Sequence, residues 1–520
     1  MTVVFLTRSC STFFSPAFFM DPAQHHWSYH VASNFLFLAD LTIRVILSAR
    51  VILKKRPYGV TIAWLIVILL LPFIGAVMYL LFGENRISEK RAARAKKSLD
   101  HYQTWLKSLE GRAPVDMTTI SPEGEHLVRQ ANTLIGIPVM DSNAMELITS
   151  PEEIMCSILA DIEKSQSTCH MQFYIWQDGG TVDKITRALI KAAQRGVTCR
   201  ILVDSIGSRE FLKGSQVALL RQAGVKVLES LPAGLFKALF ARIDIRNHRK
   251  IVVIDGEIAY TGSQNMVDPS YFKQGEGVGQ WIDMMVRITG PVVESLAGTF
   301  INDWFLETDT DDSRIKSLHD NIALIREIAD IHPGQKAGNI AVQLVPSGPG
   351  LVPDAIHKLL LTTIYAARKE LILTTPYFVP DDSLLTALKS ASERGVSVHL
   401  IIPEKNDSKL VQFASQAHFE ELMKAGVHIF LFTGGLLHSK SITVDGDFSL
   451  FGSVNLDMRS FWLNFEATLF IYNRQFTQKI RDKQKQYEQQ SLHLALSDLS
   501  ARPVTVKFKE NVSLLIGPLL

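Results

Sequence analysis

The second half of this chain repeats the pattern of the first, and an internal repeat restricts the possible folds more than any other feature of the sequence. The segment QFYIWQDGG, a helical stretch and RGVTCRILVD are matched roughly 200 residues later by TPYFVPDDS, a helical stretch and RGVSVHLIIP. Each copy reads as strand, loop, amphipathic helix and apolar β-branched strand, which is the pattern of a βαβ unit. We therefore expect an α/β protein with two similar halves, over residues 125–307 and 339–500, joined by a polar connecting segment over residues 308–338.

Each half also carries one copy of a motif that holds chemically active side chains. HRKIVVID and HSKSITVD share a histidine, a lysine two residues later and an aspartate five residues after the lysine. Gly-Ser-x-Asn begins fourteen residues after each histidine. One such match could arise by chance, but two copies with identical spacing inside a wider repeat indicate a shared function. The candidate site residues are His248, Lys250, Asp255, Ser263 and Asn265 in the first half, and His438, Lys440, Asp445, Ser453 and Asn455 in the second.

Strand geometry explains why the motif has this spacing. Alternate side chains of a strand share one face, so the histidine and the lysine of each motif point to the same side. A neutral imidazole can attack phosphorus while the ammonium offsets charge on the non-bridging oxygens. The Asp-Gly pairs that follow, at Asp255 and Asp445, predict tight hairpin turns that return the serine and asparagine to the site. Each aspartate could take part in the chemistry or only form the turn, and the sequence leaves both roles open.

The overall charge limits the kinds of partner that the chain can attract. With 54 basic and 52 acidic residues the formal net charge is only +2. No global field therefore favours a polyanion such as nucleic acid, and any phosphate chemistry must come from a local site.

Two apolar segments precede the repeat. Residues 57–83 contain no charged side chain over 27 residues, which exceeds the roughly 20 apolar residues that cross a bilayer. Pro72 is expected to kink this segment. Residues 29–53 are also mainly apolar, but they carry three charged residues, Asp40, Arg44 and Arg50. Asp40 and Arg44 can pair on a helix because they lie four residues apart, so we expect a transmembrane hairpin of two helices over residues 29–83.

The flanking segments suggest how such a hairpin would be oriented. A basic juxtamembrane linker is expected over residues 84–124, and its clustered Lys and Arg residues favour a cytoplasmic catalytic domain under the positive-inside rule. Residues 1–28 lack the pattern of a cleavable signal peptide and receive no assignment. Residues 501–520 are expected to form a C-terminal tail.

The paired HxKxxxxD motifs, each followed by GSxN, resemble the signature of the phospholipase D superfamily across residues 125–500. The resemblance implies two halves related by a pseudo-twofold axis, with one active site shared between them. It implies that one histidine attacks a phosphodiester to form a phosphohistidine, while the other protonates the leaving alcohol and then deprotonates the incoming one. By analogy we favour His248 as the nucleophile. The resemblance implies no metal and no other cofactor.

The same resemblance suggests roles for the remaining site residues. The two lysines and the two asparagines would bind the phosphoryl oxygens, with the serines in support. A carboxylate would stand behind each histidine and fix its tautomer, by the logic of a Ser-His-Asp triad. Asp283 in QWID and Glu466 in LNFE occupy the expected positions.

Within the superfamily, the chain is similar to the bacterial cardiolipin synthases. The similarity lies in the N-terminal hairpin and in segments such as YTGSQNMVDPSYFK, GVGQWIDMMVRITGP and GGLLHSKSITVDG. It implies that the phosphatidyl group of one phosphatidylglycerol is transferred to a second, with release of glycerol, at the bacterial inner membrane. Apolar residues could form a lipid-facing mouth or belong to the core: Leu239, Phe240, Leu436, Leu437, Phe461 and Trp462.

Three alternatives compete with this hypothesis. A phospholipase D that releases phosphatidic acid, or a phosphatidyltransferase with another acceptor, would use the same site. A membrane-tethered nuclease is disfavoured by the near-neutral charge. A catalytically inactive scaffold is disfavoured because both motifs are intact. The oligomeric state is left open.

Overall fold

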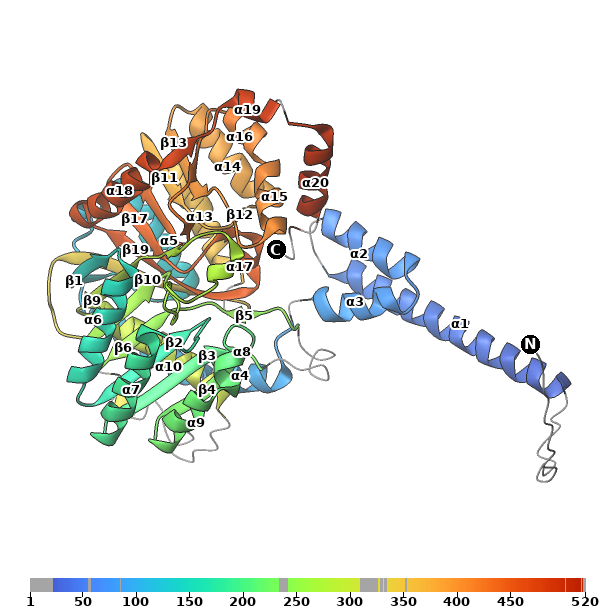
Figure 1. The fold of residues 1–520 in the computed structure, drawn as a ribbon, viewed down its shortest axis with the longest axis horizontal. Helices are drawn as coiled ribbons and strands as arrows, with labels where there is room; N and C mark the ends of the chain where they lie inside the picture. Colours follow the sequence, from blue (N-terminus) through green and yellow to red (C-terminus); the bar gives the residue numbers. More distant parts are fainter. Residues whose placement is uncertain are drawn as a thin grey trace, which may run out of the picture. The chain divides into compact units, whose positions relative to one another are not determined.

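The computed structural model describes residues 22–54, 58–84, 86–232, 242–308, 326–327, 331, 334–350, 353–500, 502–515 and 517. The chain divides into two compact units, Met1–Glu84 and Asn85–Leu520 (Figure 1).

The N-terminal unit consists of three helices in its described part: α1 (Pro22–Leu53), α2 (Tyr58–Leu70) and α3 (Ile74–Phe82). The apolar segment over residues 57–83 is thus divided into two helices at Pro72, because proline provides no N–H and disfavours a helical residue before it. Phe73, at the break, has a φ of 52°. Among the described residues, no helix combines the length and the apolarity needed to cross a bilayer. The two spanning helices expected from the sequence are therefore not confirmed.

The predicted charge pair in this unit is present. Arg44 contacts the Asp40 carboxylate at 2.6 Å, one helical turn away. The same carboxylate accepts a hydrogen bond of 3.0 Å from the backbone N–H of Phe73. Asp40 therefore also satisfies a backbone donor that the helix break leaves without a helical partner.

The unit Asn85–Leu520 carries both histidine motifs and is named the catalytic unit. It is built around one sheet, which has 16 strands in the part of the chain that the structure describes. From its centre outward, the first half has the order β1-β9-β7-β6-β2-β3-β4 and the second half has the order β10-β19-β17-β16-β11-β13-β14. The two orders match strand for strand, which confirms the predicted pair of similar halves. The first-half strands are β1 (Met140–Ile148), β2 (Thr168–Phe173), β3 (Thr198–Asp204), β4 (Lys226–Ser230), β6 (Ile251–Ile254), β7 (Ile258–Gly262) and β9 (Met285–Thr289). The second-half strands are β10 (Ile340–Ser347), β11 (Glu370–Thr374), β13 (Ser397–Pro403), β14 (His428–Phe432), β16 (Ser441–Val444), β17 (Phe448–Gly452) and β19 (Asn464–Tyr472), with β20 (Ser491–His493) at the edge.

Three strand pairings join the halves. β1 and β10 pair antiparallel at the centre of the sheet. Two short strands cross between the halves: β5 (Arg246–Asn247) pairs with β19, and β15 (Leu436–Leu437) pairs with β8 (Trp281–Ile282). A last short pair, β12 (Phe378–Val379) with β18 (Leu456–Asp457), lies within the second half. β5 and β15 each end directly before a motif histidine, so the crossing pairs position both histidines.

Helices cover the sheet on both faces (Figure 1). The parallel strands β2, β3 and β4 are connected by helices, as are β11, β13 and β14, which is the βαβ arrangement expected from the repeat. First-half helices are α6 (Pro151–Lys164), α7 (Thr181–Gln194), α8 (Arg209–Lys213), α9 (Ser215–Gln222) and α10 (Val292–Glu307). Second-half helices are α13 (Ala355–Ala366), α14 (Asp382–Glu393), α15 (Lys409–Ala417), α16 (Phe419–Lys424), α17 (Met458–Trp462), α18 (Arg474–Gln489) and α19 (Leu496–Ser500).

Two segments contain helices that the sequence did not predict, and a third lies mostly outside the described residues. Residues 84–124, expected to be a linker, include α4 (Glu89–Leu109) and the first residues of α5 (Pro122–Ile135). α4 belongs to the catalytic unit because Trp105 is buried beside α10, where Gly298 leaves room for its ring. The expected tail over residues 501–520 contains α20 (Val504–Leu515). Most of the expected connecting segment, residues 308–338, lies outside the described residues.

Candidate active site

The backbone places the two motif histidines through contacts with the opposite half. The N–H of His248 donates to the carbonyl of Phe465 in β19, at 2.9 Å. The N–H of His438 donates to the carbonyl of Ile282 in β8, also at 2.9 Å. Each histidine therefore extends a short strand that is held by the other half of the molecule.

The side chains of the two histidines also contact the opposite half. Nδ1 of His248 lies 2.9 Å from a carboxylate oxygen of Glu466 in the second half. Nδ1 of His438 lies 2.6 Å from a carboxylate oxygen of Asp283 in the first half. Both carboxylates are buried. A carboxylate on Nδ1 fixes the proton there and leaves Nε2 with a free lone pair, which is the tautomer a nucleophile or a base requires.

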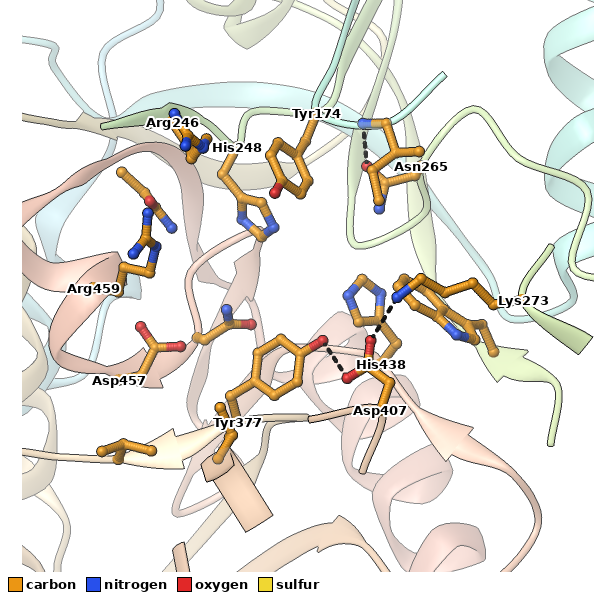
Figure 2. Close-up of a pocket in the computed structure, with 16 residues that line it drawn as sticks. Tyr174, Arg246, His248, Asn265, Lys273, Tyr377, Asp407, His438, Asp457 and Arg459 are labelled. Carbon is orange, nitrogen blue, oxygen red and sulfur yellow. Dashed lines mark hydrogen bonds and ion pairs between the residues drawn. The ribbon is translucent and has the colours of Figure 1, made fainter. Parts of the chain in front are cut away.

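Both histidines line one cavity of about 260 Å³ (Figure 2). Tyr174 and Tyr377 border the same cavity, with ring centroids 5.0 Å from the ring of His248 and 6.5 Å from that of His438, respectively. The Trp281 ring packs 4.3 Å from that of His438. The cavity is thus bordered by aromatic rings, with one imidazole from each half lining it.

Burial controls the protonation of the histidines. It lowers the pKa of His248 to about 4, and the ammonium group of Lys250 acts in the same direction while Glu466 opposes both. Burial likewise lowers the pKa of His438 to about 4, assisted by Lys440 and opposed by Asp283. Both imidazoles are therefore neutral at pH 7.

The two motif lysines lie beside the histidines and are fully enclosed. Nζ of Lys250 donates to the carbonyl of His248 at 2.7 Å, and Nζ of Lys440 donates to the carbonyl of His438 at 2.6 Å. Burial lowers the pKa of Lys250 to about 7, with a further contribution from the charge of Lys440. Burial lowers the pKa of Lys440 to about 8. Because both lysines are buried and neither bonds a carboxylate among the described residues, the pair creates a local positive site that a bound phosphate would stabilise.

The asparagines and serines of the GSxN motifs separate into two groups. Asn265 and Asn455 line the cavity. Oδ1 of Asn265 accepts from the N–H of Ile175 at 3.1 Å, while its buried Nδ2 has no partner among the described residues and is available to a phosphoryl oxygen. Ser453 instead donates to Glu466 at 2.5 Å, and Ser263 bonds the backbone of Met284. Ser453 therefore holds the Glu466 carboxylate directly, while Ser263 holds the backbone of the residue that follows Asp283.

Asp255 and Asp445 are not part of this assembly. Each follows the strand β6 or β16, so it lies roughly 20 Å along the chain from its histidine at the usual rise of about 3.3 Å per residue. The Asp255 carboxylate accepts hydrogen bonds from the N–H groups of residues 166, 167 and 168, and Asp445 does the same for residues 368, 369 and 370. Both residues have positive φ, 53° and 54°. Their geometry matches the turn-forming role that the sequence left open.

The cavity also contains charged residues that sequence reasoning missed. Lys273 and Tyr377 both bond the Asp407 carboxylate, at 3.1 and 3.0 Å (Figure 2). Asp457 caps α17 through the N–H of Ser460, and burial raises the pKa of Asp457 to about 6. Further lining residues include Arg246 and Arg459. Only Tyr174 and Tyr377 had a usable signal, since they stand at matched positions of the repeat.

The apolar residues considered for a lipid-facing mouth are mostly core. Leu436, Leu437 and Phe461 are at most 1% exposed. Trp462 is partly buried against the same core. Leu239 and Phe240 lie outside the described residues.

The fold and this site define a phospholipase D-like protein, in which each half supplies one histidine and the carboxylate for the other. The family model described as "Cardiolipin synthase, PLD-like domain" matches residues 158–304 and 360–487, and "Phospholipase_D-nuclease N-terminal" matches residues 43–84. The chain belongs to the cardiolipin synthase family of phospholipase D-like proteins.

Known relatives cover almost the whole chain. It is 43% identical over 490 residues to cardiolipin synthase A of Pectobacterium atrosepticum, spanning 94% of this chain and 98% of the relative. It is 42% identical, with the same coverage, to cardiolipin synthase A of Yersinia pseudotuberculosis. Among solved structures, phosphatidylserine synthase of Haemophilus influenzae matches 76% of this chain and 100% of its own, with a TM-score of 0.56 and 18% identity, which supports the fold.

Proposed function

We propose that the protein is a phosphatidyltransferase that joins two phosphatidylglycerol molecules into cardiolipin and releases glycerol. The observation that carries the proposal is the pair of neutral imidazoles, each held at Nδ1 by a carboxylate of the other half and each lining the same cavity. Cardiolipin as the product is supported by the 43% identity of this chain, over almost its full length, to a cardiolipin synthase A.

The first step forms the covalent intermediate. Nε2 of His248 attacks the phosphorus of the first phosphatidylglycerol, an N–P bond forms, and the bond from phosphorus to the glycerol oxygen breaks. Nε2 of His438 donates a proton to that oxygen, so glycerol leaves as a neutral alcohol. Binding of the phosphodiester anion beside both rings would raise the pKa of His438, so that Nε2 of this ring takes up a proton from solvent before the attack.

The second step releases the product. His438 is neutral after the first step, so it accepts the proton of a hydroxyl on the second phosphatidylglycerol. The hydroxyl oxygen attacks phosphorus and the N–P bond breaks, which yields cardiolipin and free His248. Because one phosphodiester replaces another, the exchange requires no nucleotide.

The surrounding residues would stabilise charge and limit hydrolysis. Asn265 and Asn455, which line the cavity, and the buried Lys250 and Lys440 beside the histidines would bind the phosphoryl oxygens. Tyr174, Tyr377 and Trp281 wall the cavity and reduce access for water, which would otherwise divert the intermediate to phosphatidic acid.

We propose that the N-terminal unit keeps the enzyme at the bacterial inner membrane as a two-helix hairpin, with the catalytic unit on the cytoplasmic side. Support comes from large exposed apolar side chains along α1, such as Phe35 and Phe37, and along α2 and α3, such as Ile66 and Ile74. The basic residues after the unit support the orientation.

One assay tests the reaction. Purified full-length protein is incubated in mixed micelles with labelled phosphatidylglycerol, without nucleotide and with a chelator. Cardiolipin and glycerol in equal amounts are expected, and the His438→Gln variant should form neither. Phosphatidic acid as the sole lipid product would instead identify a phospholipase D, and dependence on another added alcohol would identify a different acceptor.

A further inference from the structure

The C-terminal helix α20 has a face that the catalytic unit leaves uncovered. Val504, Phe508, Val512 and Leu515 are 82%, 68%, 45% and 80% exposed. At 100° per residue these four positions fall within an arc of about 80°, so they form one continuous apolar stripe. We call this set the α20 stripe. An exposed apolar stripe on an otherwise packed helix indicates an interaction surface.

The opposite face of α20 is fixed to the catalytic unit. Glu510 and Ser513 are buried, and Arg502 bonds Glu510. Lys507 reaches Glu420 of α16 at 3.2 Å. The helix packs along α15 (Figure 1). The stripe is therefore held at a defined position on the catalytic unit.

That position adjoins the catalytic cavity. Val411 of α15 lines the cavity. Beyond α20, Gly517 is buried, and a Cβ built on it would lie 3.3 Å from the side chain of Val379, which also lines the cavity. The helix thus flanks the part of the cavity wall that the second half contributes.

Other exposed apolar residues occur close to cavity residues in the chain. Leu410 is 48% exposed and precedes Val411 directly. Tyr271 is 67% exposed and stands two residues before Lys273, another lining residue. Exposed lysines lie close in sequence to the apolar residues of this region: Lys405, Lys409 and Lys509. Apolar side chains flanked by lysines suit a surface that is apolar inside and anionic at its headgroups.

We propose that the α20 stripe inserts into the surface of a phospholipid bilayer and holds the catalytic cavity against the headgroups. The α20 stripe belongs to the same unit as the catalytic cavity, so its insertion would act on that cavity directly. The bilayer is the occupant that the chemistry favours, because the stripe adjoins a cavity that takes phosphodiesters and is accompanied by basic residues. Its link to turnover rests on the proposed phosphatidyl transfer, whereas its insertion can be measured without any activity.

Insertion is tested with a polarity-sensitive dye on the full-length chain in nanodiscs of phosphatidylglycerol. The dye is attached to the Phe508→Cys variant after Cys10→Ser and Cys156→Ser, since Cys169 and Cys199 are buried. Leu219→Cys, on α9 and 53% exposed, is the matched control. Quenching by spin-labelled lipids at Phe508→Cys but not at Leu219→Cys is expected. Equal quenching by aqueous iodide at both positions would overturn the proposal, as would protection from both quenchers, which would show that protein covers the stripe.

A kinetic comparison tests the consequence for turnover. Phe508→Glu combined with Val512→Glu should raise the lipid concentration needed for half-maximal activity in micelles about tenfold or more, because apolar area no longer enters the interface. Activity on a short-chain phosphatidylglycerol below its micellar concentration should stay within about twofold of the unmodified enzyme. Leu219→Glu should change neither. Unchanged micellar activity, or an equal loss on the monomeric substrate, would overturn the proposal. If the unmodified enzyme were inactive on both substrates, the proposed function would fail while the quenching result still decided insertion.

Discussion

Nδ1 of His248 lies 2.9 Å from Oε2 of Glu466, although 218 residues separate the two in the chain. The strand that carries Glu466 is fixed at this point, since Nε of the neighbouring Arg249 donates to the Glu466 carbonyl at 3.0 Å. The carboxylate is therefore positioned independently of any ligand. It can orient the imidazole before the substrate arrives.

Replacing this carboxylate should impair catalysis more than binding. Glu466→Gln keeps the side-chain shape but removes the charge that holds the productive tautomer of His248. We expect kcat to fall by about 10²- to 10⁴-fold with little change in KM, by analogy with amide substitutions in catalytic triads. Steady-state kinetics measure the split, and thermal unfolding provides the control for folding. A proportional rise in KM at constant kcat would contradict the positioning role.

The two histidines should be individually essential and chemically distinct. His248→Ala and His438→Ala are each expected to reduce turnover by at least about 10³-fold, because one cavity requires both. With phosphatidylglycerol labelled in its phosphate, rapid quenching and peptide mass spectrometry should find the phosphoryl group on His248. A label found on His438 would reverse the two roles. Substantial activity in either variant would contradict a shared site.

The buried lysines should set the alkaline limit of activity. Their pKa values of about 7 and 8 mean that both ammonium charges are present below pH 7 and are lost as the pH rises through this range. Loss of charge weakens binding of the phosphodiester, so kcat/KM should decline above about pH 7 to 8. His248 attacks in its neutral form and has a pKa of about 4, so its titration should limit activity only on the acid side. A profile of kcat/KM that stays flat to pH 9 would contradict the lysine assignment.

Asp255 and Asp445 should matter for stability and leave the chemistry of folded molecules intact. Asp255→Ala removes an acceptor from three backbone N–H groups and places alanine at a positive φ. We expect a loss of about 1 to 3 kcal/mol in the free energy of unfolding. Activity per folded molecule should remain near that of the unmodified enzyme. Asp255→Asn tolerates the same φ and should lose less stability. Loss of kcat without loss of stability would return these residues to the catalytic group.

Most of the catalytic architecture could be predicted from the sequence, because the motif residues have the same spacing in both copies of the repeat. Matched strands, hairpins and His-x-Lys positions follow from local patterns that recur in both halves. Local patterns could not show that Glu466 and Asp283 each contact the histidine of the opposite half. This contact depends on β5 and β8, which pair with strands of the opposite half. α4 was also missed, because its many basic residues conceal the apolar positions of Trp105 and Leu109.

The cavity charges were missed for a different reason. Asp407 and Lys273 have no equivalent spacing in the two halves and meet only after folding, at 3.1 Å. Asp457 matches Val267 in the other copy, so a search for repeated residues passes over it. Such unmatched residues distinguish the surroundings of the two histidines from one another.

The antiparallel pairing of β1 with β10 joins the two halves in one sheet, so a single chain can form the whole active site. A single half, expressed alone, would contain a histidine without its carboxylate and a carboxylate without its histidine, and two copies would have to meet before either pair could form. Because both halves belong to one chain, their effective concentration is fixed by the covalent connection. The site therefore forms at any protein concentration. The joined halves can also diverge, which lets one imidazole become specialised for attack and the other for moving protons.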